Sequence, residues 1–138
     1  MADTYSYNPK SIVMTVNGLM VKGYDEGDFI VVTPNAPRLT KRVGGQGDVT
    51  YSRNPDTSGT ITLRLLKESP WNSIIQSYLN LDMTFAVNII DVLGSTRFGA
   101  AKCKVSTQAE LTFGVESGPT EWTIDFAQGK FGAGGNPL

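Results

Sequence analysis

Apolar and polar residues alternate over short runs along most of the chain, a pattern typical of half-buried β-strands. In the run from Ser11 to Tyr24, the dipeptide Asn17-Gly18 separates two β-branched segments. Asn-Gly favours a type I′ turn, because both central positions of that turn need positive φ. The pattern therefore predicts a β-hairpin, followed by a third strand over Phe29 to Thr33.

The alternation stops between Pro34 and Gly47, where prolines, basic residues and Gly44-Gly45-Gln46-Gly47 follow one another. This segment is predicted to be a long loop with room for a short hairpin arm. Loops of this length are uncommon in compact domains and are usually functional or ordered by a partner.

The remaining runs predict three more strand pairs. Val49–Arg53 is expected to pair with Ile61–Leu65 across a turn at residues 54–59, and Phe85–Ile89 with Arg97–Val105. A last hairpin is expected to join Leu111–Val115 to Trp122–Phe126, whereas residues 129–138 are rich in glycine and predicted to be a flexible tail.

One segment has helical periodicity. Ser69 is a good N-cap, Pro70 suits the first helical position, and apolar residues follow at helical spacing, which predicts a helix from Pro70 to Asn80. The whole chain, residues 1–138, is thus expected to be one mainly β domain. It combines about nine antiparallel strands in a barrel or sandwich with one flanking helix that covers an open end of the core.

Composition excludes several chemistries. The 138 residues include 12 basic and 13 acidic ones, no histidine and one cysteine. Histidine-based catalysis, a histidine-ligated zinc site, an internal disulfide and polyanion binding driven by bulk charge are therefore not expected. The sequence also shows neither a signal peptide nor an apolar run near the roughly 20 residues of a membrane span, so we expect folding in a cytoplasm and no membrane contact.

Two segments, one acidic and one rich in glycine, are candidates for ligand binding. Asp25-Glu26-Gly27-Asp28 lacks the spacing of a calcium loop, so it is interpreted as a solvated turn. Gly44-Gly45-Gln46-Gly47 precedes a strand rather than a helix and lacks the Lys-Ser or Lys-Thr of a phosphate loop. No metal and no cofactor is predicted.

Single candidate residues also favour structural roles. Cys103 lies on an apolar strand face and is interpreted as a buried thiol. Nothing in the spacing of Asp82, Asp91 and Asp125 assembles an acid–base pair, while Trp71 and Trp122 are in phase with apolar neighbours. No catalytic residue is predicted, and the protein is not expected to be an enzyme.

The order of these pieces resembles the tail tube proteins of contractile-tailed bacteriophages. The matching stretches cover nearly the whole chain: Tyr5–Lys10 leading into a hairpin, Phe29–Val49, the segment Asn54–Leu63, the Ser69-Pro70 helix start, and Glu121-Trp122. The resemblance implies a β-barrel subunit that joins five copies of itself in a hexameric ring, with rings stacked into a hollow tube inside a contractile sheath.

In such tubes the long loop reaches a neighbouring subunit or ring. By position, the resemblance assigns this contact to Arg38, Leu39, Thr40, Lys41, Arg42, Val43, Gly44, Gly45, Gln46 and Gly47. It further implies a virion tail protein assembled in the host cytoplasm, with the sheath, a baseplate or initiator complex and a tail terminator as partners. DNA would pass through the lumen without specific binding.

Two other functions stay open. The tube of a type VI secretion system or a related injection machine shares the architecture. A monomeric β-sandwich binding module, for example for sugars, would use Trp71 or Trp122 as a stacking platform.

Overall fold

The computed structural model describes residues 9–25, 27–92, 96–115 and 118–133. Within them it contains ten β-strands, one α-helix (α1, Trp71–Asn80) and a short 3₁₀ turn (η1, Pro9–Ser11). The strands are β1 (Ile12–Val16), β2 (Leu19–Met20), β3 (Ile30–Pro34), β4 (Leu39–Val43), β5 (Val49–Arg53), β6 (Gly59–Leu66), β7 (Phe85–Asp91), β8 (Arg97–Thr107), β9 (Pro119–Phe126) and β10 (Gly129–Gly132).

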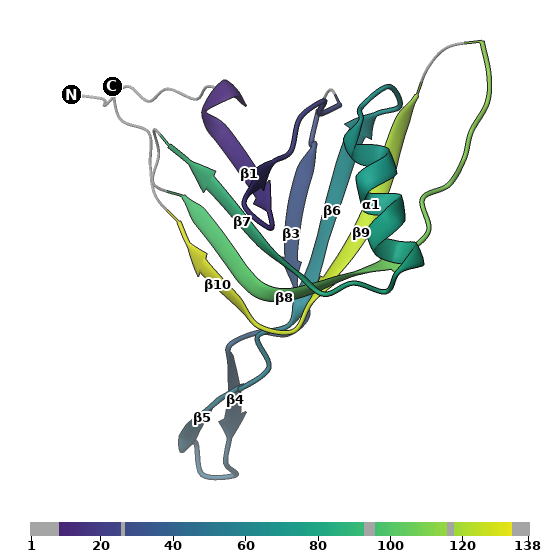
Figure 1. Cartoon of the computed structure of the whole chain (residues 1–138). Helices are drawn as coiled ribbons and strands as arrows, with labels where there is room; N and C mark the ends of the chain where they lie inside the picture. The colour runs from purple at the N-terminus through teal and green to yellow at the C-terminus, as the bar shows by residue number, and fades with distance from the viewer. Residues whose placement is uncertain (1–8, 26, 93–95, 116–117, 134–138) are drawn as a thin grey trace.

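Eight of the strands form one antiparallel sheet in the order β2-β1-β7-β8-β9-β6-β3, with β10 also pairing with β8. The sheet bends so that its two halves face each other, and α1 lies across it at one side (Figure 1). The expected fold class, mainly β and antiparallel with one flanking helix, is confirmed. The strands β4 and β5 form a separate two-stranded sheet.

The core occupies the concave side of the bent sheet. Strand β6 pairs with β9 along its full length, from Gly59 opposite Phe126 to Leu66 opposite Pro119. Its alternate residues Ile61, Leu63 and Leu65 are fully buried, as the period of a strand requires. Gly59 is needed where β6 begins, because a Cβ there would collide with the Thr33 carbonyl and the Phe126 ring.

The first hairpin forms as its sequence predicts. Asn17 and Gly18 have φ of 52° and 83°, which are the left-handed values that a type I′ turn needs. The Asn17 side chain also accepts a hydrogen bond from the Ala86 N–H at 3.1 Å, which ties the turn to β7.

The helix starts where the Ser-Pro pair predicts. Pro70 already has helical dihedral angles, and the Ser69 hydroxyl oxygen accepts a hydrogen bond from the Trp71 N–H at 3.3 Å while donating to the Lys22 carbonyl at 2.7 Å. Trp71 and Ile75 are buried against the sheet, so the start of the helix is fixed by both hydrogen bonding and packing.

Three sequence-based predictions, two of strand pairing and one of a flexible tail, are wrong. Strand β5 pairs with β4 rather than with β6, whose two neighbours are β3 and β9. Residues 111–115 are not a strand, and Leu111, Phe113 and Val115 are exposed. Residues 129–132, predicted to begin a flexible tail, form β10, while 134–138 and most of the lead-in at 1–10 lie outside the described residues.

Asn72 joins the helix to both the β6 end and β9. Its amide donates to the carbonyls of Leu66 and Lys67 at 2.9 and 3.1 Å, and its oxygen accepts a hydrogen bond from the buried Trp122 indole at 3.1 Å.

We predict that Asn72→Ala lowers the free energy of unfolding by about 1–3 kcal/mol, because it leaves the indole N–H of Trp122 buried without its acceptor. Chemical denaturation followed by tryptophan fluorescence measures the change. Ser73→Ala, one residue along and exposed, is the control and should stay within about 0.5 kcal/mol. Equal losses in the two variants would contradict this role for Asn72.

Candidate assembly surface

Strands β4 and β5 form an arm, residues 38–53, that projects from one end of the body (Figure 1). Residue pairs run from Leu39 opposite Arg53 to Val43 opposite Val49. Every residue from 37 to 53 is exposed, so the arm contributes nothing to the core of its own chain. An isolated two-stranded hairpin is only marginally stable in water, which points to a partner surface outside the chain.

The two faces of the arm differ in character. Because side chains alternate along a strand, one face carries Leu39, Val43, Val49 and Tyr51 together with Lys41 and Arg53. The other face carries Thr40, Arg42, Thr50 and Ser52. The four large apolar side chains of the first face are between 45% and 63% exposed. This face is therefore apolar with two basic side chains, Lys41 in its middle and Arg53 at the base of the arm.

Charge is concentrated on the arm. Residues 38–53 include four basic residues and a single acid, Asp48, although the whole chain has a formal net charge of −1. The rest of the chain thus has an excess of four acids. Such asymmetry favours contact between the arm and an acidic surface of another molecule.

Gly44–Gly47 form the tip of the arm. The Gly44 N–H donates to the Asp48 carbonyl at 2.7 Å and the Gly47 N–H donates to the Gly44 carbonyl at 3.0 Å. Gly47 has φ of +90°, a conformation that L side chains rarely adopt. The glycine-rich run therefore closes a hairpin instead of holding a phosphate.

The base of the arm is held by a compact set of hydrogen bonds. Asn35 bonds to Ser58 through both backbone and side chain, at 3.0 and 3.1 Å, and Asn54 N–H donates to the Arg38 carbonyl at 2.7 Å. The Asp56 carboxylate accepts the Ser58 hydroxyl and N–H at 2.6 and 3.0 Å, and these bonds lower the pKa of Asp56. The arm consequently leaves the body from a fixed position.

All ten residues that the sequence assigned to the interface lie on this arm. Arg38 precedes β4, residues 39–43 form it, and residues 44–47 make the tip. Sequence reasoning missed the β5 half, including Tyr51 and Arg53, because β5 was expected to pair with β6. The alternation of Val49, Tyr51 and Arg53 was the available indication of a strand.

The aspartates considered for catalysis lie in ordinary surface or structural settings. Asp82 is 3.8 Å from the Lys104 ammonium, and Asp125 is the cross-strand neighbour of the same lysine. Asp91 is buried and accepts the Ser11 hydroxyl at 2.7 Å. Among the described residues, no group of three or more acidic, histidine or cysteine side chains could hold a metal ion.

Both tryptophans are buried, which argues against a sugar-stacking surface. Trp71 and Trp122 are 5% and 2% exposed, and each indole donates to a partner inside the chain, the Met20 carbonyl and Asn72. A ring that is covered on both faces cannot stack on a glycan.

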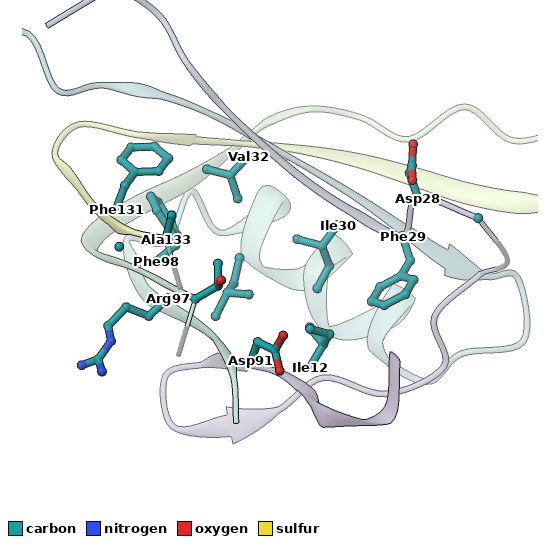
Figure 2. A pocket seen from close by; sticks show the side chains of 14 residues that line it. Ile12, Asp28, Phe29, Ile30, Val32, Asp91, Arg97, Phe98, Phe131 and Ala133 are labelled. Carbon is teal, nitrogen blue, oxygen red and sulfur yellow. The ribbon is translucent and has the colours of Figure 1, made fainter. Parts of the chain in front are cut away.

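An apolar cavity of about 350 Å³ lies on the side where the sheet does not close. Ile12, Ile30, Val32, Phe98 and Phe131 approach it from both halves of the sheet, whereas Arg97 points away (Figure 2). The described lining residues do not bring a nucleophile and a base together. No described helix is long and apolar enough to cross a membrane.

The sequence matches the family model of the bacteriophage PhiTE tail tube protein over residues 2–130. The chain therefore belongs to this family of tail tube proteins, which are structural proteins and not enzymes. A search of curated proteins finds no match.

Solved structures of contractile injection systems share the fold. The cap that terminates the tube of the anti-feeding prophage has a TM-score of 0.65 at 12% identity, covering 96% of this chain and 95% of the cap. The sheath/tube terminator of the extracellular contractile injection system PVC has a TM-score of 0.61 at 13% identity, and the match covers 96% of this chain and 100% of the terminator chain. A chain of the PVC sheath–tube complex has a TM-score of 0.60 at 12% identity, and the match covers 94% of this chain and 93% of that one.

Cys103 is buried, and burial raises the pKa of its thiol from 9.0 to about 11. At neutral pH we expect thiol reagents to modify the folded protein at least about a hundredfold more slowly than the denatured chain, since two pKa units reduce the thiolate that much. Between pH 9 and 11 the folded state keeps a proton that the unfolded chain releases, so the free energy of unfolding falls as pH rises. Labelling of Cys103 in the folded protein as fast as in the denatured chain would contradict the expected protection of the thiol.

Excision of the arm should leave the body intact. We predict that replacing residues 38–53 by two glycines changes the free energy of unfolding by less than about 1 kcal/mol, because no buried side chain is removed. Circular dichroism and chemical denaturation measure the effect. A loss of folded structure would show that the arm stabilises its own chain.

Proposed function

We propose that this protein is the repeating subunit of a phage tail tube, in which hexameric rings stack into a hollow conduit for DNA inside a contractile sheath. The observation that carries the proposal is the exposed arm, whose apolar and basic face is left uncovered by the described residues of its own chain. Membership of the tail tube family supports the same role.

Ring closure would use the free edges of the sheet. Within the described residues the main strand order ends at β2 and β3, and these two strands and β10 each have a ladder partner on one side only. Open edges invite non-specific pairing in a monomer, whereas a closed ring gives each edge a defined neighbour. Val31, 37% exposed in β3, adds an apolar contact at one of these edges.

A DNA conduit needs a lining that does not hold the polyanion. Two of the basic residues outside the arm are already balanced by acids of the same chain. Arg64 forms an ion pair with Glu121 at 3.0 Å, and Lys104 lies 3.8 Å from Asp82. Where these residues face the lumen, this balance would weaken their attraction for DNA.

The proposed partners follow from the assembly. The tube would contact the tail sheath along its outside, an initiator or baseplate complex at one end and a tail terminator at the other. Assembly would take place in the cytoplasm of the bacterial host, and the mature protein would be part of the virion tail.

A second candidate function comes from the structural neighbours, two of which are described as a tube-terminating cap and a terminator. A terminator would end a tube instead of extending it. Purified protein that forms single rings but no stacks would favour this function, and capture of protein effectors instead of DNA would favour an injection-system tube.

The charge reversal Arg38→Glu, Lys41→Glu and Arg42→Glu tests the proposed contact of the arm. We expect the unchanged protein to form rings or tubes of uniform width by negative-stain electron microscopy, with a matching mass by light scattering. The reversed variant should keep its circular dichroism spectrum but lose stacking, because the arm then carries acidic side chains where basic ones would meet an acidic surface.

The matched control reverses Lys22, Arg97 and Lys102, which are exposed and lie outside the arm, so that it changes the net charge equally. Tubes in the arm variant, or loss of tubes in both variants, would overturn the assignment of the arm.

A further inference from the structure

A second unpartnered surface lies on the connection between β8 and β9. Leu111, Phe113 and Val115 are 71%, 79% and 106% exposed, more than any other large hydrophobic residue that the structure describes. They alternate with Glu110, Thr112 and Gly114, as the residues of a half-buried strand do. Yet none of the described strands pairs with them.

The segment is held in place although its apolar side chains are exposed. At its start Ala109 is buried, and Gln108 and Gln76 exchange hydrogen bonds of 2.7 and 2.8 Å. Further along, the Lys67 ammonium donates to the Thr112 carbonyl at 2.8 Å and lies 4.3 Å from the centre of the Phe113 ring. These contacts present the apolar residues in a fixed position.

A groove of about 310 Å³ separates the segment from α1 and β9, with Asn72, Gln76 and Trp122 in its wall. Leu111 lines this groove, and Phe113 and Val115 continue the exposed apolar surface beyond it. An exposed apolar patch beside a groove is a feature of interaction sites.

The segment and the arm lie toward opposite ends of the molecule. In Figure 1 the arm projects below the sheet, while residues 111–115 run upward beside α1 to the other end. The two apolar surfaces therefore cannot cover each other within one copy. In two copies arranged head to tail they can, and a contact of this type repeats without closing.

Charge favours a second copy of the chain as the occupant. The arm has four basic residues and one acid, whereas the rest of the chain has an excess of four acids, which favours contact between the arm and the body of another copy. The segment itself carries one acid, Glu110, and the Lys67 ammonium lies against it, so its match to the arm rests on apolar character and position.

We propose that residues 110–115 are the surface that receives the arm of a second copy. Leu111, Phe113 and Val115 pack against Leu39, Val43, Val49 and Tyr51. Placing this contact between successive rings rests on the proposed function. The contact between two copies can be tested by itself.

Site-directed crosslinking tests the contact. In a Cys103→Ser background, one preparation carries Tyr51→Cys and the other Phe113→Cys, and the two are mixed and treated with a short bis-maleimide. We expect a crosslinked dimer that contains one copy of each. The control pairs Tyr51→Cys with Leu81→Cys, an equally exposed apolar site (70%) at the end of α1.

Phe113→Ser gives an independent measurement. We expect the protein concentration at half-assembly to rise about tenfold, as for truncation of a central interface residue, while Leu81→Ser leaves it unchanged. Circular dichroism verifies that both variants fold, since each site is exposed.

The outcomes separate the two proposals. Tubes without a crosslink above the control would overturn the receiving surface and leave the tube function standing. A protein that shows no rings or tubes but gives the specific crosslink would support the contact while the tube function fails. Absence of the crosslink in that case would overturn both.

Discussion

The packing of α1 and the concave face of one bent antiparallel sheet is the interaction on which the rest of the structure depends. Alternate residues of β6, β8 and β9 supply this core, and Trp71 and Ile75 of α1 cover it. Burial of such side chains is the main favourable contribution to folding. Because the body meets this need by itself, the arm and the β8–β9 connection are free to present apolar residues outward.

Exposed apolar strands carry a risk of aggregation, and the arm limits that risk with its charges. Lys41 and Arg53 lie among its apolar residues and Arg42 lies on the opposite face, and charged side chains on an exposed strand hinder pairing with an arbitrary partner. The same charges favour an acidic surface of a second copy. The same basic side chains would therefore both hinder non-specific strand pairing and favour an acidic partner surface.

The elements of the body could be predicted from the sequence because period and burial agree there. The Asn17-Gly18 hairpin, β7 with β8, and the Ser69-Pro70 helix start all appear as their patterns indicate. The position of the arm could also be predicted, from the break in alternation at Pro34. Its β5 half could not, since alternation shows that one face of a strand is covered but does not name the strand or the molecule that covers it.

The end of the chain was misjudged for a different reason. A glycine-rich composition suggested a tail, but Phe131 packs on the rings of Phe98 and Phe126, with centroids 5.0 and 6.2 Å away. Gly129 is required there, because a Cβ would meet both of these rings. A single aromatic residue between glycines can thus fix a strand where average composition predicts none.

The two largest errors, at β5 and at residues 111–115, have a common cause. Both segments have the alternation of a strand that is buried on one side, and in both the described part of the chain leaves that side exposed. Selection for burial leaves the same pattern whether the covering surface belongs to the same molecule or to a neighbour. A mismatch between periodicity and pairing within the chain is therefore evidence for an interface. The two segments lie toward opposite ends of the molecule, so a contact between them would join two copies head to tail. A head-to-tail contact that does not close can repeat, and it would let an assembly grow in one direction.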